Sequence, residues 1–433
     1  MILLLIIADD FTGALDTGVQ FAERGIETRV VVGEQAELTA HGSEVLVVDT
    51  ETRHLPAEKA GEIVRQLTLQ AKKAGVRYIY KKTDSALRGN IGAELSAVLG
   101  ASGCSRLPFL PAYPQMGRST RGGIHYIGDV PVTESPFGAD PFAPVRHSAV
   151  TELIAEQSIY PSYSFPALRG DDELPDRNGI LVFDAATEQD LLETGRRLLT
   201  RNALAVSAGC AGFAAILPDL LSIPRKKAPD CPHLDPRLLV VCGSVNPITL
   251  AQMDAAEKAG FVRIRLSPLQ KLERGHWDST AGQKELGDIE HTLASNRYCI
   301  LETNDPGGNQ PTADLAASLG IDHEAMRVRI AGGLGTLVGA LFTSPALGTL
   351  LITGGDTLLQ CMQCIGAAEL VPVCELEEGV VLASFTYKGC TRFIITKSGG
   401  FGRENLLIEL ADFIARTAPE ETPPVDVRME GII

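Results

Sequence analysis

The sequence lacks the features that mark membrane, secreted and nucleic-acid-binding proteins. Its 433 residues contain no apolar run near the roughly 18 residues that a membrane-spanning helix needs. The apolar stretch 1–8 has no basic region before it and runs directly into Asp9, so we interpret it as a strand and not as a signal peptide. Nine scattered cysteines form no disulfide framework, which favours the cytoplasm as the compartment.

Basic residues are also in deficit. The chain has 39 lysines and arginines against 54 acidic residues, for a net charge of −15. Nucleic acids and anionic membranes attract basic surfaces, so we expect neither as a partner. Any site for an anion must therefore be built locally. Hydrophobic residues make up 45% of the chain, which is enough for apolar cores in two or three domains.

Several motifs of nucleotide, hydrolytic and metal chemistry are missing as well. The chain has no P-loop, no nucleophile elbow and no paired-histidine zinc motif. Residues 333–339 imitate a dinucleotide fingerprint, but their glycine spacing is wrong and they lie in an apolar, helix-like run. Cys361 and Cys364 have the spacing of metal ligands without a second pair, so we interpret them as core residues.

The sequence does contain an alternation of short apolar runs and helical segments, which predicts an α/β fold of two domains with mainly parallel sheets. A proline-rich segment without hydrophobic period, residues 224–236, is the predicted linker between an N-terminal domain (1–223) and a C-terminal domain (237–418). Residues 419–433 are expected to be a loose tail. The predicted strands are residues 1–8, 27–32, 44–48, 76–80, 107–110, 180–183, 204–206, 238–242, 261–266, 298–301, 350–353 and 393–396.

A charged loop, residues 81–90, stands between a predicted strand and a predicted helix, for which Asn90 is the expected N-cap. Two further strand ends carry polar side chains, and the carboxyl ends of parallel strands meet at one edge of a sheet, where ligands bind. We therefore expect a ligand crevice at this edge; a solvated, salt-bridged loop is the alternative. The side chains expected to converge are Asp9, Asp10, Arg53, Lys82, Asp84, Ser85 and Arg88.

Residues 117–132 form an excursion with a predicted hairpin turn at Gly128-Asp129. Two interpretations of this excursion stay open: a flap over the crevice, or an oligomer contact that would make the protein a homodimer.

The second half carries three glycine-rich loops between predicted strands and helices, at residues 243–244, 354–357 and 398–402. Glycines let backbone amides approach phosphate oxygens, and the N-terminus of a helix adds partial positive charge. Three such loops suit a nucleotide, although each loop alone is also consistent with a tight turn.

Four motifs resemble those of the four-carbon acid sugar kinases: residues 7–18, 82–90, 354–357 and 397–402. The resemblance covers nearly the whole chain up to the tail. It implies a two-domain kinase with a ligand cleft between the domains, in which the first domain binds a four-carbon sugar acid and the second binds ATP. By position it implies the substrate residues Asp9, Asp10, Arg53, Lys82, Asp84, Ser85 and Arg88, the catalytic residues Asp10 and Asp84, and the nucleotide residues Ser244, Gly354, Gly355, Asp356, Thr357, Gly399 and Gly400.

The implied cofactors are ATP and Mg2+, and phosphorylation of the terminal hydroxyl would give a 4-phosphate. Phosphoryl transfer depends on alignment and charge neutralisation, which a closing cleft supplies. A carboxylate among Asp9, Asp10 and Asp84 would accept the hydroxyl proton or help to place Mg2+. The sequence does not say which of them, and it identifies no metal ligand.

The carboxylate of the substrate is expected to bind Arg88, assisted by Lys82 or Arg53, because a guanidinium fork matches a carboxylate. The alternative is that Arg88 pairs with Asp84 or Glu94 and only braces the loop.

The sequence departs from the family pattern at two positions. Ala86 replaces an expected threonine, which leaves threonate, erythronate and 3-oxo-tetronate open as substrates. Gly400 replaces an expected asparagine but keeps its backbone amide. Two other functions compete with the kinase: a binding protein that closes on an anion without chemistry, and a nicotinamide-dependent dehydrogenase that rests on residues 333–339 alone.

Overall fold

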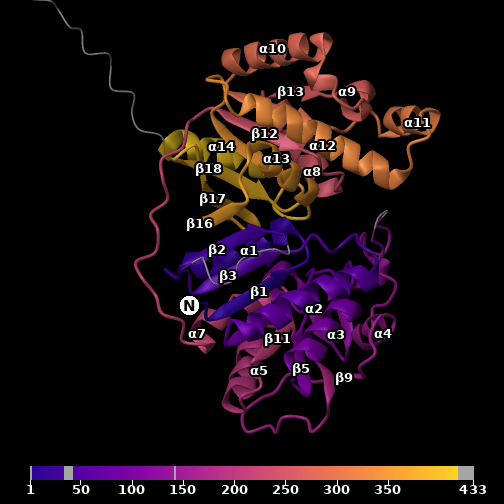
Figure 1. The fold of residues 1–433 in the computed structure, drawn as a ribbon, viewed down its shortest axis with the longest axis vertical. Coiled ribbons are helices and arrows are strands. Elements are labelled where there is room, and N and C mark those ends of the chain that lie inside the picture. Colours follow the sequence, from indigo (N-terminus) through magenta and orange to yellow (C-terminus); the bar gives the residue numbers. More distant parts are fainter. Residues whose placement is uncertain (1, 34–41, 141–142, 418–433) are drawn as a thin grey trace, which may run out of the picture.

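The computed structural model describes residues 2–33, 42–140 and 143–417 and confirms the α/β class. One fifteen-stranded sheet runs through both halves of the chain, with helices on both of its faces (Figure 1). A separate antiparallel sheet of three strands belongs to the N-terminal half: β6 (Arg118–Arg121), β7 (Ile124–Ile127) and β8 (Val130–Pro131). Within the described ranges, no helix is long and apolar enough to cross a membrane.

The N-terminal half contributes eight parallel strands to the large sheet. In sheet order they are β2 (Thr28–Val32), β3 (Val45–Asp49), β1 (Leu4–Ala8), β4 (Tyr78–Lys82), β11 (Val206–Gly209), β5 (Arg106–Leu110), β10 (Gly179–Phe183) and β9 (Ser162–Phe165). The helices of this half are α1 (Phe11–Ala22), α2 (Ala57–Lys73), α3 (Ile91–Ser102), α4 (Val150–Ala155), α5 (Glu188–Thr200), α6 (Ala211–Ala214) and α7 (Leu217–Leu220).

The C-terminal half contributes five parallel strands and an antiparallel hairpin. In sheet order they are β13 (Val262–Arg265), β14 (Tyr298–Glu302), β12 (Leu238–Cys242), β15 (Thr349–Thr353), β18 (Cys390–Lys397), β17 (Val380–Tyr387) and β16 (Glu369–Glu377). The helices are α8 (Pro247–Lys258), α9 (Pro268–Leu272), α10 (Thr280–Ser295), α11 (Gln310–Ser318), α12 (His323–Leu341), α13 (Gly355–Ile365) and α14 (Leu406–Thr417).

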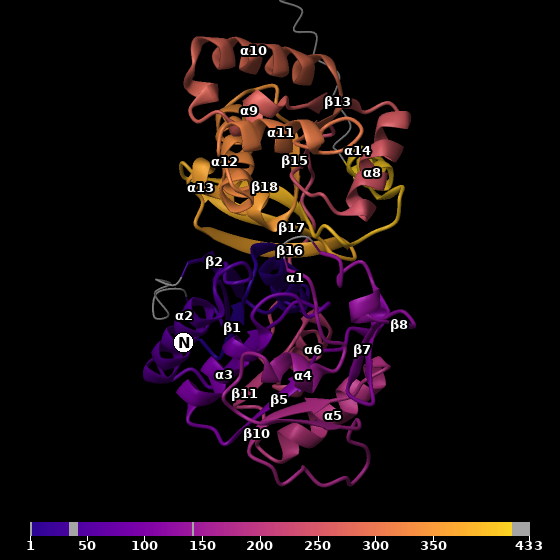
Figure 2. The same ribbon diagram turned by 90° about the vertical axis from the view of Figure 1, so that its right-hand side faces the viewer.

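The hairpin β16–β17 was not predicted from the sequence, and it joins the two halves. Leu370 of β16 pairs antiparallel with Val30 of β2, and Figure 2 shows β16 at the boundary between the halves, above α1 and beside β2. Register shifts between Pro372 and Cys374 and again near Glu377 interrupt the pairing of β16 with β17. Such bulges break the alternation by which a strand is identified. The linker is therefore not the only connection between the halves.

Both faces of the N-terminal sheet are covered, because alternate residues of each strand point to opposite sides. Leu4 and Ile6 of β1 belong to one apolar cluster with Phe11 of α1. Leu5 and Ile7 belong to a second cluster, with α2 and α3. Such two-sided burial explains why the strands are nearly continuous apolar runs, and it leaves the loops at the strand ends as the place for polar chemistry.

Several smaller predictions can be compared with the structure. Residues 224–236 contain no helix or strand, and the segment runs along the outside of the molecule from α7 to β12 (Figure 1). Residues 333–339 lie inside α12, so they form no nucleotide loop. All nine cysteines are free. Cys361 is buried in α13 as predicted, but Cys364 is exposed, so its interpretation as a core residue was wrong. The predicted tail, 419–433, lies outside the described residues.

The role predicted for Asn90 needs a correction. It does precede α3, but its side chain makes no capping hydrogen bond. Instead Nδ2 donates to the carbonyl oxygens of Thr52 at 2.9 Å and Leu55 at 2.8 Å. The asparagine thus ties the charged loop to the loop after β3.

Candidate active site

Three strand ends place the predicted polar residues side by side. Strand β1 lies between β3 and β4, and its last residue, Ala8, is in register with Asp49 on one side and Lys82 on the other. The loops that follow these strands therefore begin at one edge of the sheet.

Arg53 is the hub of this edge. Its Nε donates to Asp9 Oδ2 at 2.8 Å, and its two terminal nitrogens donate to the two carboxylate oxygens of Asp10 at 2.9 and 2.8 Å. Asp84 Oδ1 lies 3.6 Å from the same guanidinium. Burial opposes ionisation of Asp9, but Arg53, Lys81 and Lys82 outweigh it and lower the pKa of Asp9. The positive charge of Arg53 is thus already balanced by the protein.

Arg88 is engaged in the same way. It holds Asp84 through two hydrogen bonds of 3.0 Å each, and its third contact is Asp140 at 3.3 Å. Burial favours a neutral Asp84, but Arg88 and Arg53 hold its pKa well below the usual range. Asp84 Oδ2 also accepts the backbone N–H of Ala86 at 3.1 Å, which fixes the loop. The structure therefore shows the pairing that the sequence left open as the alternative, Arg88 with Asp84.

The two adjacent lysines of this edge have different environments. Lys81 pairs with the buried Glu94 at 3.0 Å and donates to the Ile7 carbonyl oxygen. Its contacts are therefore with the protein interior. Lys82 is only 4% exposed, yet its ammonium forms no ion pair or hydrogen bond with the described residues. A Cβ atom on Gly13 would lie 2.8 Å from Lys82 Nζ and 2.4 Å from Asp10 Oδ1. Glycine at position 13 thus leaves room for these two groups.

Asp16 of α1 is a buried carboxylate that the predicted site did not include. Its Oδ1 is buried and has no hydrogen-bond partner in the part of the chain that the structure describes. Burial raises the pKa of Asp16 to about 7, with Lys82 and Arg118 acting against the rise and Glu375 and Asp10 adding to it. It is therefore a carboxylate near its protonation point at neutral pH, among groups of the charged edge.

The excursion at residues 117–132 packs on the charged loop. His125 Nε2 lies 3.0 Å from the carbonyl oxygen of Ser85, and Arg118 Nη1 donates to the Ser85 hydroxyl. Burial lowers the pKa of His125 to about 4, so this histidine is neutral at physiological pH. These contacts place β6 and β7 against the crevice.

The three glycine loops of the second half also meet. They follow β12, β15 and β18, which are neighbours in the sheet. A Cβ on Gly243 would collide with Thr357 Oγ1 at 1.8 Å, and a Cβ on Gly399 would lie 2.9 Å from Ser244 Oγ. Gly354 has a φ of 103°, which only glycine adopts readily. The structure brings together Ser244, Gly354, Gly355, Asp356, Thr357, Gly399 and Gly400 around the N-terminus of α13.

Two charged groups border these loops. Asp356 Oδ2 pairs with Arg327 of α12 at 2.6 Å, so its charge is neutralised by an arginine. Lys397 at the end of β18 is fully buried, and it donates to the Ser398 carbonyl oxygen at 3.0 Å and to Thr249 Oγ1 at 3.3 Å. Burial lowers the pKa of Lys397 to about 8. Among the described residues it has no acidic partner, so an added anion would stabilise its charged form.

The two sets of loops face each other. A Cβ on Gly355 would lie 3.6 Å from Asp10 Oδ2 and 3.7 Å from Thr12 Oγ1. Beside this contact is a cavity of about 270 Å³ whose walls come from both halves, with Arg53, His54 and Asn90 on one side and Glu324 of α12 on the other. The glycine loop after β15 therefore borders the carboxylates after β1.

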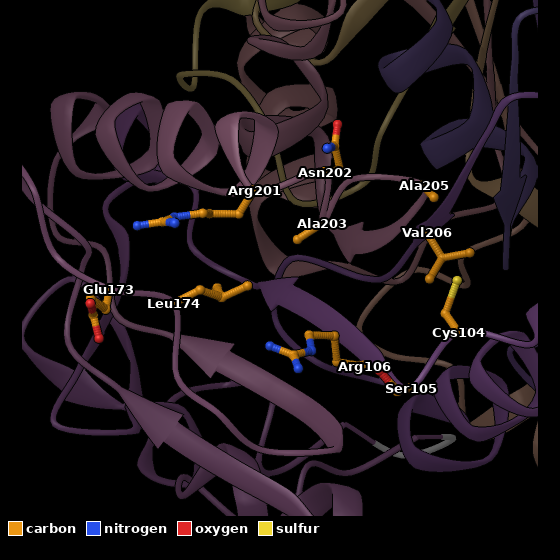
Figure 3. Close-up of a pocket in the computed structure, with 10 residues that line it drawn as sticks. All are labelled: Cys104, Ser105, Arg106, Glu173, Leu174, Arg201, Asn202, Ala203, Ala205 and Val206. Atoms are coloured by element: carbon orange, nitrogen blue, oxygen red, sulfur yellow. The ribbon is translucent and has the colours of Figure 1, made fainter.

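A larger cavity, of about 600 Å³, lies elsewhere (Figure 3). Its walls include Arg106 at the start of β5, Val206 at the start of β11 and Arg201 after α5. This is the amino-terminal edge of the strands, opposite to the edge that carries the charged loops. None of the residues predicted for the site lines it.

Three buried polar residues of the site region were not assigned a role from the sequence: Asp16, Arg118 and Lys397. Asp16 and Lys397 lie within the motifs at residues 7–18 and 397–402, so their position in these motifs could have indicated a role in the site. Arg118 stands outside every motif. Its burial against Ser85 depends on how the excursion packs on the charged loop, and the sequence predicted the hairpin turn of the excursion but not this packing.

Comparison with known proteins shows which family the chain resembles in sequence. Residues 4–217 match the model of a sugar-binding N-terminal domain, and residues 239–407 match that of a nucleotide-binding C-terminal domain. The chain is 28% identical to the D-threonate kinase of Salmonella typhimurium, over 95% of this chain and 98% of the relative. It is 30% identical to the D-threonate kinase of Bordetella bronchiseptica, over 94% and 96%, and 27% identical to the D-erythronate kinase of Heliobacterium modesticaldum, over 98% and 99%.

A solved structure supports the fold. A protein of Salmonella typhimurium LT2 superposes with a TM-score of 0.76 at 21% identity, over 94% of this chain and 98% of the other. With both domain models matched and a relative 30% identical along almost its whole length, the chain belongs to the family of four-carbon acid sugar kinases.

Proposed function

We propose that this protein is an ATP-dependent kinase that phosphorylates the terminal hydroxyl of a four-carbon sugar acid to give the 4-phosphate. In this proposal residues 1–223 bind the acid and residues 237–418 bind the nucleotide. The names of the relatives support the reaction and the class of substrate. These names specify different four-carbon acids. D-threonate, D-erythronate and 3-oxo-tetronate are therefore all candidates.

The observation that carries the proposal is the contact between the two sets of loops. A nucleotide held by the glycine loops would direct its phosphates toward the N-terminus of α13, where backbone N–H groups and the helix dipole favour an anion. That N-terminus lies next to Asp10 and Thr12: a Cβ atom added to Gly355 would be in van der Waals contact with both side chains. Two substrates bound on either side would therefore have their reacting groups at the same place.

On the nucleotide side, each residue has a distinct role in the proposal. The amides of Gly354, Gly355, Gly399 and Gly400 and the hydroxyls of Ser244 and Thr357 donate hydrogen bonds to phosphate oxygens. Asp356, neutralised by Arg327, accepts a hydrogen bond from a ribose hydroxyl or binds the cation that accompanies ATP. Lys397, which lacks an acidic partner among the described residues, adds a positive charge below the loops.

On the acid side, Lys82 supplies an ammonium without a partner among the described residues, and Ser85 supplies a hydroxyl that accepts a hydrogen bond from Arg118 and still has its own O–H to donate. Arg53 and Arg88 are held in place by ion pairs with Asp9, Asp10, Asp84 and Asp140. Asp10 lies beside the phosphate loop and orients the terminal hydroxyl. Asp16, with an unpartnered oxygen and a pKa raised to about 7, is suited to accept the hydroxyl proton at neutral pH.

The residues present fit Mg2+ in one way. The described residues contain no group of three or more side chains that could hold a metal alone. Mg2+ usually binds one or two carboxylates and completes its shell with phosphate oxygens and water. Asp10 and Asp356 are carboxylates next to the phosphate loop and would hold the ion, which supplies charge neutralisation when bound.

Two alternatives receive less support. A dehydrogenase would need residues 333–339 as a loop between a strand and a helix, but they lie within α12. A binding protein without chemistry leaves the phosphate loops beside Asp10 without a purpose. Melting curves with ATP, ADP or NAD separate the three, because a ligand that binds the folded state raises the melting temperature.

The substitution Gly355→Ala tests the carrying observation. The methyl group finds only ordinary contacts at 3.6 and 3.7 Å, so the fold is expected to survive, but the methyl enters the space between Asp10 and the phosphates. Release of ADP in the presence of each acid should fall strongly. Gly332→Ala on α12 is the matched control, because its methyl group also meets only an ordinary contact, Gln360 Oε1 at 3.9 Å, and it should keep wild-type turnover. Wild-type turnover in Gly355→Ala would contradict the proposed meeting point.

A further inference from the structure

Arg118 is a buried arginine held between aromatic rings of both halves. It is 5% exposed. Its guanidinium carbon lies 5.3 Å from the ring centre of Phe137 and 5.5 Å from that of Phe401. Phe137 follows β8 in the N-terminal half, whereas Phe401 belongs to the glycine loop after β18. Arg118 therefore touches the side chain of the nucleotide loop while it donates a hydrogen bond to Ser85 of the charged loop.

Arg118 differs from the other arginines of the site in its partners. Arg53 contacts three aspartates, and Arg88 contacts two. No carboxylate of the described residues lies within ion-pair distance of Arg118, and its Nε and Nη2 make no hydrogen bond to them. A buried cation without a counter-ion is unfavourable. An anion bound beside it removes that penalty.

The surroundings of Arg118 match the proposed substrate. Lys82 is a second buried cation of the N-terminal half without an ion pair among the described residues, and it lowers the pKa of the same carboxyl group as Arg118 does, that of Asp16. Ser85 lies on the loop that follows Lys82 and is held by Arg118. A hydroxylated acid bound beside Ser85 would therefore find a planar guanidinium in contact with a hydroxyl, on the loop that follows the Lys82 ammonium.

We propose that Arg118 is the group that binds the carboxylate of the sugar acid. This inference rests on the proposed function and changes one part of it, since Arg88 and Arg53 then serve to hold the loops. The guanidinium fork offers two parallel hydrogen bonds to a carboxylate, and the two rings fix its plane. Because Phe401 comes from the nucleotide loop, closure of the halves completes the position of Arg118, and acid and nucleotide bind cooperatively.

The test compares Arg118→Met and Arg118→Lys with Arg121→Met in the full-length chain. Arg121 lies on the same strand but is exposed, where it stacks on Tyr126 at 4.3 Å and pairs with Asp129 at 3.5 Å. The readout is the ratio of kcat/KM for the best acid of the panel to kcat/KM for its neutral alditol, threitol or erythritol.

Arg118→Met is expected to lower kcat/KM for the acid by about 10- to 150-fold, which is the effect of losing a charge-assisted hydrogen bond, and to leave the alditol nearly unchanged. Arg118→Lys should fall between, and Arg121→Met should match the wild type. If Arg118 only pins Ser85, the variants will melt at lower temperature and lose activity on acid and alditol alike. An unchanged ratio therefore overturns the inference.

A binding measurement keeps this inference separate from the proposed function. Calorimetry with D-threonate and D-erythronate in the presence of ADP needs no phosphoryl transfer. If the wild type phosphorylates no acid but binds one, and Arg118→Met binds it at least tenfold more weakly, the kinase proposal fails while Arg118 stands as the carboxylate site. Equal affinity of wild type and Arg118→Met, or no binding by the wild type, overturns the inference.

Discussion

Replacing Asp16 by asparagine is expected to stabilise the protein and to abolish its activity, and the stabilisation should grow with pH. Asp16 is buried, and burial raises its pKa from 3.8 to about 7. In the unfolded chain the Asp16 carboxyl group loses its proton at about pH 4, whereas in the folded protein it keeps the proton up to about pH 7. The aspartate therefore lowers the free energy of unfolding progressively between these two pH values, and the loss levels off above the higher one.

The size of the effect follows from the shift. A difference of one unit between the folded and unfolded pKa corresponds to about 1.4 kcal/mol. The free energy of unfolding is therefore lowered by roughly 1.5 kcal/mol at pH 5 and by roughly 4 kcal/mol at pH 8. Asparagine has no such proton. The advantage of Asp16→Asn over the wild type should therefore increase by roughly 3 kcal/mol from pH 5 to pH 8.

Urea unfolding of the wild type and Asp16→Asn at pH 5, 6, 7 and 8 measures this difference. Asp171→Asn is the control, because the Asp171 side chain is fully exposed and its effect should be small at every pH. A difference that does not depend on pH, or an asparagine variant that loses stability relative to the wild type as the pH rises, would refute the buried, protonated Asp16. The same variant should show a kcat at least a hundredfold lower; a normal kcat would show that Asp16 does not accept the proton.

Two further predictions follow from the ion pairs of the site. Asp356→Ala should raise the KM for ATP about tenfold or more and leave the KM for the acid almost unchanged, because Asp356 borders the phosphate loop. Initial rates with each substrate varied in turn measure both constants. A selective loss of acid affinity would contradict the assignment of Asp356 to the nucleotide. Arg88→Lys should destabilise the protein by about 1 to 3 kcal/mol, since its two hydrogen bonds to buried Asp84 are lost, yet retain the preference for acid over alditol; thermal melts and substrate ratios check this, and a lost preference would return the carboxylate to Arg88.

The sequence predicted the features that depend on neighbouring residues. The ends of β1, β3 and β4 were predicted to within two residues, with Lys81 and Lys82 falling in β4 and not in the loop, because each end follows a short buried run. Parallel strands bring such ends together. The glycine loops were predicted from their composition. Gly354 needs its positive φ, which is a local requirement. Gly243 needs its missing side chain because Thr357 of α13 packs against it, and the neighbours of Gly243 in the sequence do not show that contact.

The features that the sequence did not predict depend on the conformation of a loop or on residues far apart in the chain. Whether Arg88 faces the substrate or Asp84 is decided by how the loop closes on itself, and Asp140 adds a partner from another segment. Arg118 becomes buried only when Phe137 and Phe401 pack on it, although 264 positions separate the two rings in the sequence. The pairing of β16 with β2 likewise joins segments from opposite halves.

The position of the new phosphate tests the central claim most directly. Wild-type protein is incubated with ATP, Mg2+ and each of D-threonate, D-erythronate and 3-oxo-tetronate, and the products are examined by phosphorus and proton nuclear magnetic resonance. The account predicts one equivalent of ADP per product and a phosphorus nucleus coupled to the two protons on C4 of at least one acid. Release of ADP without a phosphorylated acid, a phosphate on another oxygen, or no ADP with any acid would contradict it.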